Sequence, residues 1–327
     1  MFKHTETEKN NLRPATMICL LDPVAQLKPE GFENYEDNQG NRFIKEKGKF
    51  IGTLALEDDN RYNLLSSLPV KGLSKIKSFI LKIRDNATGN IVAAKTGPIP
   101  TLLKEAELMD QATNPHITQF LGMAVSKNAD PCIIMEWLHG GTLKDQIQKP
   151  SLNLPLHWLA STIDQTATAL SHINMIGYVH GDIKPSNIMF NEEGKVKVVD
   201  FSNSFPITEA GSTSPDISCD ISNNYAPPEQ FTLATKGKGR LHIQSDVFSF
   251  ATVIFESLTC RKSKLDREAF VEDVELPVPL SAAYGDILPS TKQKLLSHSL
   301  RRALAPDYRK RHATIEEFNS EIQEILA

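Results

Sequence analysis

The chain has 327 residues, of which 40% are hydrophobic and 23% are charged, and its formal net charge is -4. This is the balance of an ordinary globular protein with enough apolar material for a core, and it gives no electrostatic reason to expect a nucleic acid or a membrane surface as partner. The apolar runs are far shorter than the roughly 20 residues that span a bilayer, which excludes a transmembrane helix.

The cysteines and the first residues point to a reducing compartment. The four cysteines are scattered, without a C-x-x-C pair or any metal-ligand spacing. The opening stretch MFKHTETEKNN lacks the basic and then apolar pattern of a secretory leader. We therefore expect a cytoplasmic protein without a membrane span.

Residues 1–62 are interpreted as an N-terminal extension of unknown role. They are polar and show neither a motif nor an internal repeat. Two strands are expected in them, at residues 16–21 and 49–56.

The next part of the chain is predicted to be a small sheet with one helix. A turn containing Gly and Asn at 85–90 separates two apolar runs, as in a hairpin. A helix is expected at 101–112, with Thr101 as its N-cap after Pro100. Strands are expected at residues 78–84, 91–95, 117–125 and 131–138.

The remainder is predicted to be mostly helical. From Leu156 to Ile173 apolar residues recur every three or four positions, and Gly177 follows where a C-cap glycine is expected. Ser290 is expected to be the N-cap of a later helix. The other expected elements are a strand at 195–199 and helices at 248–258 and 290–304. A β-rich part therefore precedes an α-rich part, which predicts an α+β fold class.

The segment YVHGDIKPSNIMF, residues 178–190, gathers polar residues in a pattern that packing does not require. Pro185 interrupts any regular helix or strand there. Asp182 and Asn187, with Asp200 at the end of the next strand, are oxygen ligands of the kind that Mg²⁺ prefers. Lys184 could neutralise a phosphoryl group. The segment therefore predicts a magnesium phosphate site.

Five motifs in a fixed order resemble those of the eukaryotic-type protein kinases. HGDIKPSN is similar to the H-R-D-L-K-P-x-N catalytic loop, and VDFS is similar to D-F-G. VAAK, YAPPE and SDVFSF resemble the strand-three lysine motif, the A-P-E motif and the start of a late helix. The resemblance runs from about residue 64 to the end of the chain.

This resemblance implies a bilobal protein-kinase-like fold, with a small β-rich N-lobe at residues 63–138 and a larger α-helical C-lobe at residues 139–327. It also implies a protein serine/threonine kinase that transfers the γ-phosphate of Mg-ATP to Ser or Thr hydroxyls of protein substrates. The implied cofactors are ATP and Mg²⁺, with Mn²⁺ as an alternative metal. The implied partners are protein substrates and an unidentified activator.

The resemblance also assigns roles to single residues. Asp182 would be the catalytic base, and Lys184 would stabilise the transferred phosphoryl group. Asn187 and Asp200 would hold the metal ions, and Lys95 would bind the α and β phosphates. The remaining ATP-binding residues would be Ile80, Ala93, Glu105, Glu136, Leu138 and Met189, and the structural residues would be His180, Glu229, Asp246 and Arg311.

Three of these roles are contacts between side chains or with the backbone. Glu105 is expected to form an ion pair with Lys95. Glu229 and Arg311 are expected to form a buried ion pair. Asp246 is expected to hold the backbone of the catalytic loop.

The phosphate-binding loop departs from the family pattern. Counting back from Lys95 places Leu73, Lys75 and Ser78 where the family has glycines. Without glycine, backbone N–H groups approach phosphates less closely, so this loop is expected to bind ATP differently or more weakly. Lys75 would supply a side-chain contact instead.

Two further departures affect the catalytic loops. Gly181 replaces the arginine that normally receives an activation-loop phosphate, which argues against that switch. Ser202 replaces the glycine of D-F-G and is expected to stiffen the backbone beside the metal ligand. A basic loop near the expected peptide-docking region carries Lys236, Lys238 and Arg240.

Two other functions stay open at this point. The glycine-poor loop and Ser202 suit a pseudokinase that acts as a scaffold or binding module with weak or no catalysis. Transfer of phosphate or nucleotide to a small molecule is a third reading, because relatives of the fold do this. Retention of both Asp182 and Asn187 favours catalysis, and the A-P-P-E motif favours a protein substrate. The divergent loops resemble those of bacterial or pathogen-borne kinases. If the chain is a bacterial effector, it would be delivered to the cytosol of a host cell.

Overall fold

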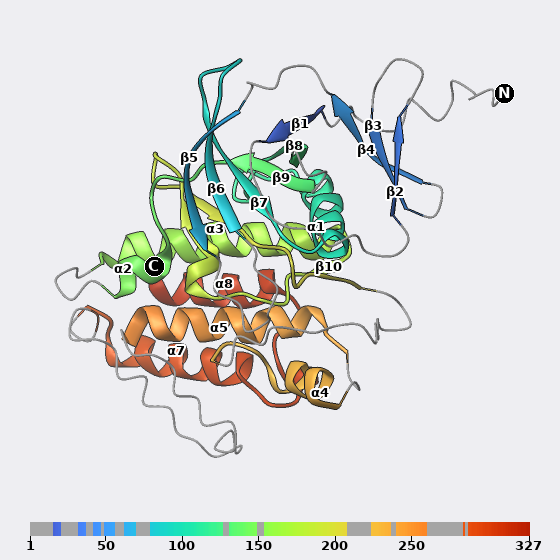
Figure 1. Cartoon of the computed structure of the whole chain (residues 1–327). Coiled ribbons are helices and arrows are strands. Elements are labelled where there is room, and N and C mark those ends of the chain that lie inside the picture. Colours follow the sequence, from blue (N-terminus) through green and yellow to red (C-terminus); the bar gives the residue numbers. More distant parts are fainter. Residues whose placement is uncertain are drawn as a thin grey trace. The chain divides into compact units, whose positions relative to one another are not determined.

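The computed structural model describes residues 16–20, 32–36, 42–46, 49–55, 62–69, 79–126, 131–148, 154–207, 224–236, 240–259, 284 and 287–327. The chain divides into two compact units, Met1–Asp110 with Gln119–Trp137, and Gln111–Thr118 with Leu138–Ala327. The described part of the first unit is mostly sheet and that of the second mostly helix (Figure 1). The predicted α+β class is therefore confirmed.

The first unit is built on one sheet, whose described strands follow the order β2-β3-β4-β1-β8-β9-β7-β6-β5. The predicted hairpin is present as an antiparallel pair of strands, β6 and β7. The strands are β1 (Thr16–Leu20), β2 (Phe32–Glu36), β3 (Arg42–Glu46), β4 (Lys49–Ala55), β5 (Tyr62–Pro69), β6 (Phe79–Asp85), β7 (Ile91–Thr96), β8 (Phe120–Ser126) and β9 (Pro131–Glu136). The two strands expected in the N-terminal extension correspond to β1 and β4, and β2 and β3 were not predicted.

The register of this sheet shows which side chains share each of its two faces. Lys82 lies opposite Ala93, which lies opposite Met135, and Ile80 lies opposite Lys95. Because directly opposed residues point to the same side and successive residues alternate, these side chains share one face. The other face carries a buried cluster formed by Tyr62, Ile83, Val92, Ala94, Ala124, Cys132 and Ile134.

The helix of the first unit, α1 (Ile99–Gln111), begins earlier than predicted. The backbone N–H of Leu102 donates to the carbonyl oxygen of Pro98, so Thr101 lies inside the first turn and is not the N-cap. Pro100 is accepted there because the first N–H groups of a helix have no partner within the helix. By contrast, the strand predicted to begin at residue 117 begins later, at Phe120.

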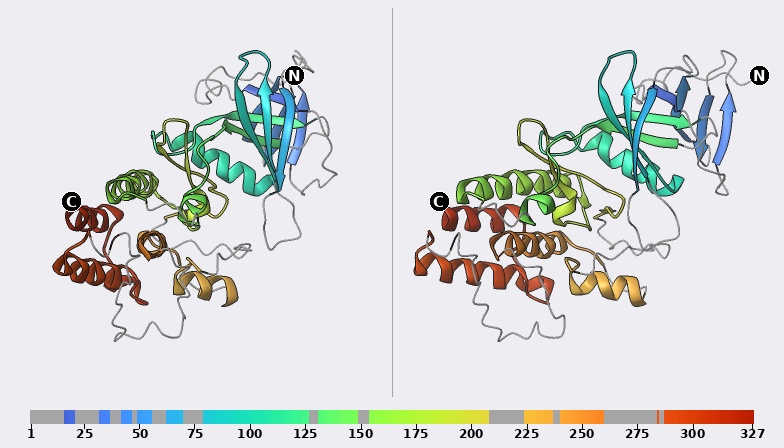
Figure 2. Two further views of the ribbon diagram at one scale, coloured as in Figure 1. Left: turned by 90° about the vertical axis from the view of Figure 1, so that its left-hand side faces the viewer. Right: turned by 60° about the vertical axis from the view of Figure 1, so that its left-hand side comes forward.

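Helices form most of the second unit. Four of them, α3, α5, α7 and α8, pack along one another (Figures 1 and 2). Phe250 and Phe318 are fully buried between α5 and α8, with edge-on rings. The helices are α2 (Leu143–Ile147), α3 (Leu156–Met175), α4 (Pro228–Lys236), α5 (Ile243–Thr259), α7 (Ser290–Ala303) and α8 (Ile315–Leu326), with 3-10 turns at Pro185–Asn187 and Tyr308–Lys310.

The ends of two helices test the predicted caps. Gly177 follows the end of α3 with φ +87°, so the predicted C-cap glycine is confirmed. The predicted Ser290 cap was wrong, because Pro289 occupies the N-cap position and Gln293 donates its N–H to the Pro289 carbonyl. Ser290 is instead the first residue of α7.

Short strands connect the helices at the loops of interest. β10 (Tyr178–Val179) pairs with β13 (Phe205–Pro206), and β11 (Ile188–Phe190) pairs with β12 (Val196–Val198), both antiparallel. These two pairs fix the chain on either side of the segment that holds Asp182. The loop chemistry predicted from the sequence is therefore held by regular structure at both ends.

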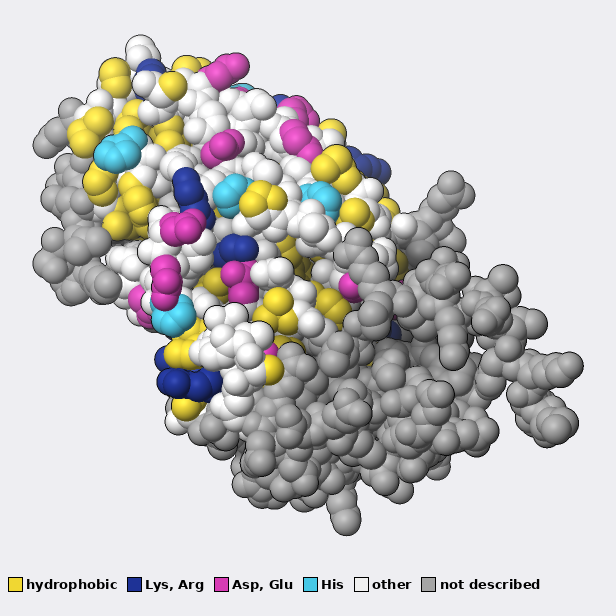
Figure 3. Space-filling model, turned by 90° about the horizontal axis from the view of Figure 1, so that it is seen from above, with side chains coloured by type: hydrophobic (Ala, Val, Ile, Leu, Met, Phe, Trp, Pro, Cys, Tyr) yellow, Lys and Arg dark blue, Asp and Glu magenta, His cyan; other side chains and the backbone are white. Residues whose placement is uncertain are grey.

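The described surface agrees with the modest net charge. In Figure 3 acidic and basic side chains lie among one another and among apolar ones on the visible coloured face. Across the described ranges, no helix is long and apolar enough to cross a membrane.

Candidate active site

In the first unit, Lys95 and Glu105 form a buried ion pair. The Lys95 Nζ lies 2.7 Å from each carboxylate oxygen of Glu105, and only 6% and 2% of the two residues is exposed. β7 presents the lysine and α1 presents the glutamate on its buried side. A buried pair with two short bonds is held far more firmly than an exposed one.

The other nucleotide-site candidates of this unit lie on the same sheet. Ala93 is buried and Ile80 is half-buried, on the face that carries Lys95. Glu136 ends β9, where its carboxylate accepts the backbone N–H of Gln119 at 2.7 Å. Lys82, opposite Ala93 on this face, was not predicted, and its Nζ lies 4.8 Å from the ring centroid of Trp137. Alternation of side chains along a strand places Lys82 on the same face as Ile80, and this pattern could have indicated it.

In the second unit, the candidate base Asp182 is buried and held by its own loop. Lys184 donates its Nζ to Asp182 Oδ2 at 2.6 Å. The Asn187 Nδ2 donates to the carbonyl oxygen of Asp182 at 2.9 Å and to its Oδ2 at 3.2 Å. The short spacing seen in the sequence thus brings a lysine and an amide onto one carboxylate. Such an arrangement can align a hydroxyl group and stabilise negative charge near it.

His180 is a buried structural member of this loop. Its Nδ1 accepts the backbone N–H of Asp182 at 3.3 Å, and its Nε2 lies 3.3 Å from the carbonyl oxygen of Val199. This pairing places the proton of the neutral ring on Nε2. Burial lowers the pKa of His180, which favours that neutral form.

Asp246, in the first turn of α5, holds the backbone of the catalytic loop. Its Oδ2 accepts the N–H of His180 at 2.8 Å, and its Oδ1 accepts the N–H of Gly181 at 3.0 Å. Burial raises the pKa of the Asp246 carboxyl, whereas the nearby His180 and the two N–H groups oppose that rise. The side chain is thus a bridge from α5 to the loop rather than a simple helix cap.

Asp200 follows β12 with an unusual backbone. Its φ is +67°, the one positive value at a residue other than glycine within the described ranges. The Ser202 hydroxyl donates to Asp200 Oδ1 at 2.8 Å. Ser202 therefore contacts the carboxylate that is predicted to bind metal, a contact that was not predicted.

The donors in this unit fit a magnesium ion. The backbone N–H of Val199 donates to the carbonyl oxygen of Asn187 at 3.0 Å, so Asn187 and Asp200 leave the β11–β12 pair at the same end. The Asn187 amide nitrogen is directed to Asp182, which leaves its amide oxygen as the ligand atom. The described residues contain no cluster of three His, Cys, Asp or Glu side chains for a metal. The amide oxygen of Asn187 and the carboxylate of Asp200 are hard oxygen ligands of the kind that Mg²⁺ takes together with water and phosphate.

Two further candidates for adenine contacts belong to the second unit. Leu138 is buried, and Met189 is half-buried in β11, where it forms a bridge with Thr142. The predicted positions Leu73, Lys75, Ser78 and Lys238 lie outside the described residues, as does the side chain of Lys236, and Arg240 is exposed.

Glu229 and Arg311 form the buried ion pair that the resemblance implied. Arg311 donates from Nη1 to Glu229 Oε1 at 2.7 Å and from Nη2 to Oε2 at 3.0 Å. Its other three N–H groups reach the carbonyl oxygens of Ala305, Gln244 and Pro306. All five donors of the guanidinium are therefore used.

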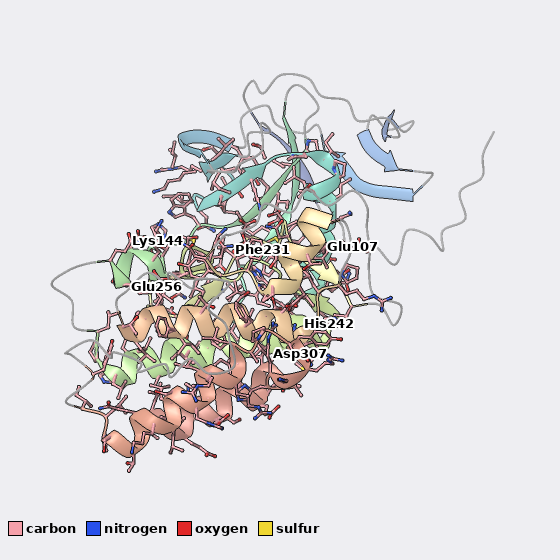
Figure 4. The ribbon with its side chains drawn as sticks, turned by 90° about the horizontal axis from the view of Figure 1, so that it is seen from below. Glu107, Lys144, Phe231, His242, Glu256 and Asp307 are labelled. Carbon is pink, nitrogen blue, oxygen red and sulfur yellow. The ribbon has the colours of Figure 1, made fainter. Side chains whose placement is uncertain are left out.

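The YAPPE segment is also attached to α5, through Tyr225. The Tyr225 hydroxyl donates to the buried Glu256 carboxylate at 2.5 Å, and the Ser249 hydroxyl donates to the Tyr225 carbonyl at 3.0 Å. Figure 4 labels Glu256 on α5 and Phe231 on the neighbouring α4. Burial and this carboxylate raise the pKa of Tyr225. This contact was not predicted, since Glu256 lies in an apolar helical pattern.

Gly181, which stands where the family pattern has arginine, has a left-handed backbone of the kind that favours glycine. Gly181 has φ +73°, and a Cβ atom there would lie 2.5 Å from the carbonyl oxygen of Asn203. No real Cβ contact is that short, so either Asn203 or the loop would have to move. An arginine at this position would therefore require a shift of Asn203 or of the loop.

Replacing Gly181 by alanine is expected to destabilise the fold more than the same change at Gly194. Gly194 also has φ +73°, but no atom lies within 4 Å of the point that a Cβ would occupy there. Both variants lose the left-handed freedom of glycine, at about 1–2 kcal/mol. Only Gly181→Ala adds an overlap, which should cost about 1–3 kcal/mol more. Urea unfolding of the two variants measures the difference, and equal losses would contradict the steric explanation.

The comparisons with known proteins agree with this geometry. Residues 91–298, more than half of the chain, match the family model "Protein tyrosine and serine/threonine kinase", and the chain belongs to this family. The predicted family and the predicted bilobal fold are thereby confirmed.

One similar protein is the "Probable serine/threonine-protein kinase PknB" of Bifidobacterium longum (strain NCC 2705). It is 29% identical over 232 residues, which cover 67% of this chain and 32% of that protein. The chain thus spans about a third of the length of this relative.

Proposed function

We propose that the chain is an ATP-dependent protein kinase that transfers the γ-phosphate of Mg-ATP to Ser or Thr hydroxyls of protein substrates. The observation that carries the proposal is the buried Asp182 carboxylate with Lys184 at 2.6 Å and Asn187 at 3.2 Å. Family membership and the name of the relative support the same activity. Residues 63–138 and 139–327 would be the two lobes.

In this proposal each group of residues has a separate task. Lys95, fixed by Glu105, binds the α and β phosphates, and Ile80 and Ala93 contact the adenine ring. Asn187 and Asp200 hold Mg²⁺, which neutralises charge on the phosphates when bound.

The chemistry of transfer falls to two residues. Asp182 orients the substrate hydroxyl and accepts its proton, and Lys184 stabilises the transferred group. The lysine two positions after the base, where tyrosine kinases have a different motif, favours Ser or Thr as the acceptor.

One observation favours a second function. Ser202 donates to Asp200 Oδ1, so the hydroxyl competes with a metal ion for that oxygen. A pseudokinase that binds partners with weak or no catalysis would tolerate this contact.

Transfer of labelled γ-phosphate from Mg-ATP separates the two functions. The purified chain and its Asp182→Asn variant are incubated with a mixed protein extract, since asparagine keeps the size of the side chain and removes the base. We expect a loss of about a hundred- to ten-thousandfold in transfer, the size of a general base contribution. Equal background from both proteins would favour the pseudokinase.

A further inference from the structure

In the two consecutive peptide groups that precede Asp182, both N–H groups and both carbonyl oxygens form hydrogen bonds. In the group between His180 and Gly181, the carbonyl oxygen accepts the Ser204 hydroxyl at 3.2 Å, and the N–H donates to Asp246 at 3.0 Å. In the next group, between Gly181 and Asp182, the N–H donates to His180 Nδ1 at 3.3 Å. The carbonyl oxygen of this second group accepts Nε2 of Gln230 at 2.8 Å.

Gln230 is a buried side chain of the first turn of α4. Only 2% of the residue is exposed, and its N–H donates to the Pro227 carbonyl. It directly follows Glu229, whose ion pair with Arg311 anchors the start of α4. The position of its amide is therefore fixed by the YAPPE segment, not by the catalytic loop.

The contact acts on the peptide plane that carries the candidate base. Asp182 begins where this plane ends, so a rotation of the Gly181–Asp182 peptide would move the Asp182 carboxylate. Glycine resists such a rotation least of all residues. Because glycine has no side chain to limit this rotation, the hydrogen bond from Gln230 restrains the peptide plane instead.

We propose that Gln230 is a positioning residue for Asp182, which makes the geometry of the catalytic base depend on seating of the YAPPE segment. This proposal rests on the proposed kinase function of the same site. No charged group on the activation loop is needed for this restraint. The bond instead orders the loop through a neutral amide.

The test compares Gln230→Met with wild type in the full chain. Methionine has a similar length but no N–H donor, so the Gly181 carbonyl loses its partner. We expect kcat for protein phosphorylation to fall about ten- to a hundredfold, the effect of misplacing a catalytic group. The KM for ATP should stay near wild type. The unfolding midpoint should fall, because a buried carbonyl loses its donor, so the positioning role is measured as a loss of kcat in protein that is still folded at the assay temperature.

Gln323→Met is the matched control. Gln323 also donates its Nε2 to a backbone carbonyl, that of Ala160 at 3.0 Å, but joins α8 to α3. Its kcat should equal that of wild type. A kcat of Gln230→Met equal to that of the control would overturn the proposal. Gln230→Leu, which also lacks an N–H donor and places no charge in this buried position, replaces Gln230→Met if the latter does not fold.

Hydrogen exchange separates failure of this inference from failure of the proposed function. In a chain without any transferase activity, faster exchange at the Gly181 and Asp182 amides in Gln230→Met than in Gln323→Met would still support the positioning role. Unchanged exchange at these amides would overturn it. Transfer activity of wild type alone decides the proposed function.

Discussion

Replacing Asp200 by asparagine is expected to reduce metal-dependent phosphoryl transfer by about a hundred- to a thousandfold, because a charged ligand of the metal is lost. Asparagine is a better test than alanine because the backbone at Asp200 is left-handed, with φ +67°. Asn and Asp adopt this conformation more readily than alanine. Asparagine also keeps an oxygen to accept the Ser202 hydroxyl.

The measurement is γ-phosphate transfer over a range of Mg²⁺ concentrations, with unfolding followed on the same samples. Asp164→Asn, the same change at an exposed residue of α3, is the control and should leave transfer unchanged. Undiminished metal-dependent transfer by a folded Asp200→Asn variant would reject Asp200 as a metal ligand. Loss of transfer together with loss of folding would instead make Asp200 structural.

Replacing Arg311 by methionine is expected to lower the free energy of unfolding by about 3–5 kcal/mol, the cost of leaving a buried partner without its counter-ion. The Arg311 side chain is fully buried, and Glu229 would retain the Ser245 hydroxyl, which is a neutral partner. Three carbonyl oxygens would also lose their donor.

Arg302→Met is the control for this change. Arg302 pairs with Glu317 at 2.5 Å, but about 40% of each side chain is exposed. Exposed pairs contribute about 0–1 kcal/mol. Urea unfolding of both variants should therefore give a large loss for Arg311→Met and a small one for Arg302→Met. Similar losses would mean that burial does not determine the strength of the Arg311 pair.

The sequence predicted those parts of the site that local motifs encode. Asp182, Lys184 and Asn187 are neighbours in the chain, so their spacing alone brings them together in a short loop. Lys95 and Glu105 required one more step, that a strand and the following helix pack on each other. The family motif supplied this step, which composition and periodicity could not.

Contacts between distant segments were harder to predict. The partners of Gln230 and Glu256 lie 49 and 31 positions away in the chain. No motif relates these positions, whereas the family resemblance supplied the equally distant contact of Glu229 with Arg311. The caps at Thr101 and Ser290 failed for a different reason. The helix begins earlier in both cases, at Ile99 with the Pro98 carbonyl as first acceptor and at Ser290 after Pro289, whereas the sequence rule favours the hydroxyl residue as the cap.

The left-handed backbone at Gly181 also constrains how this chain can evolve. A single substitution that restores arginine would meet the Asn203 carbonyl before any benefit of the new charge could arise. A compensating shift near Asn203 would have to come first, so the two changes are coupled and their effects are not additive. Arginine at this position would thus require a second change near Asn203, even though the two patterns differ there at one position.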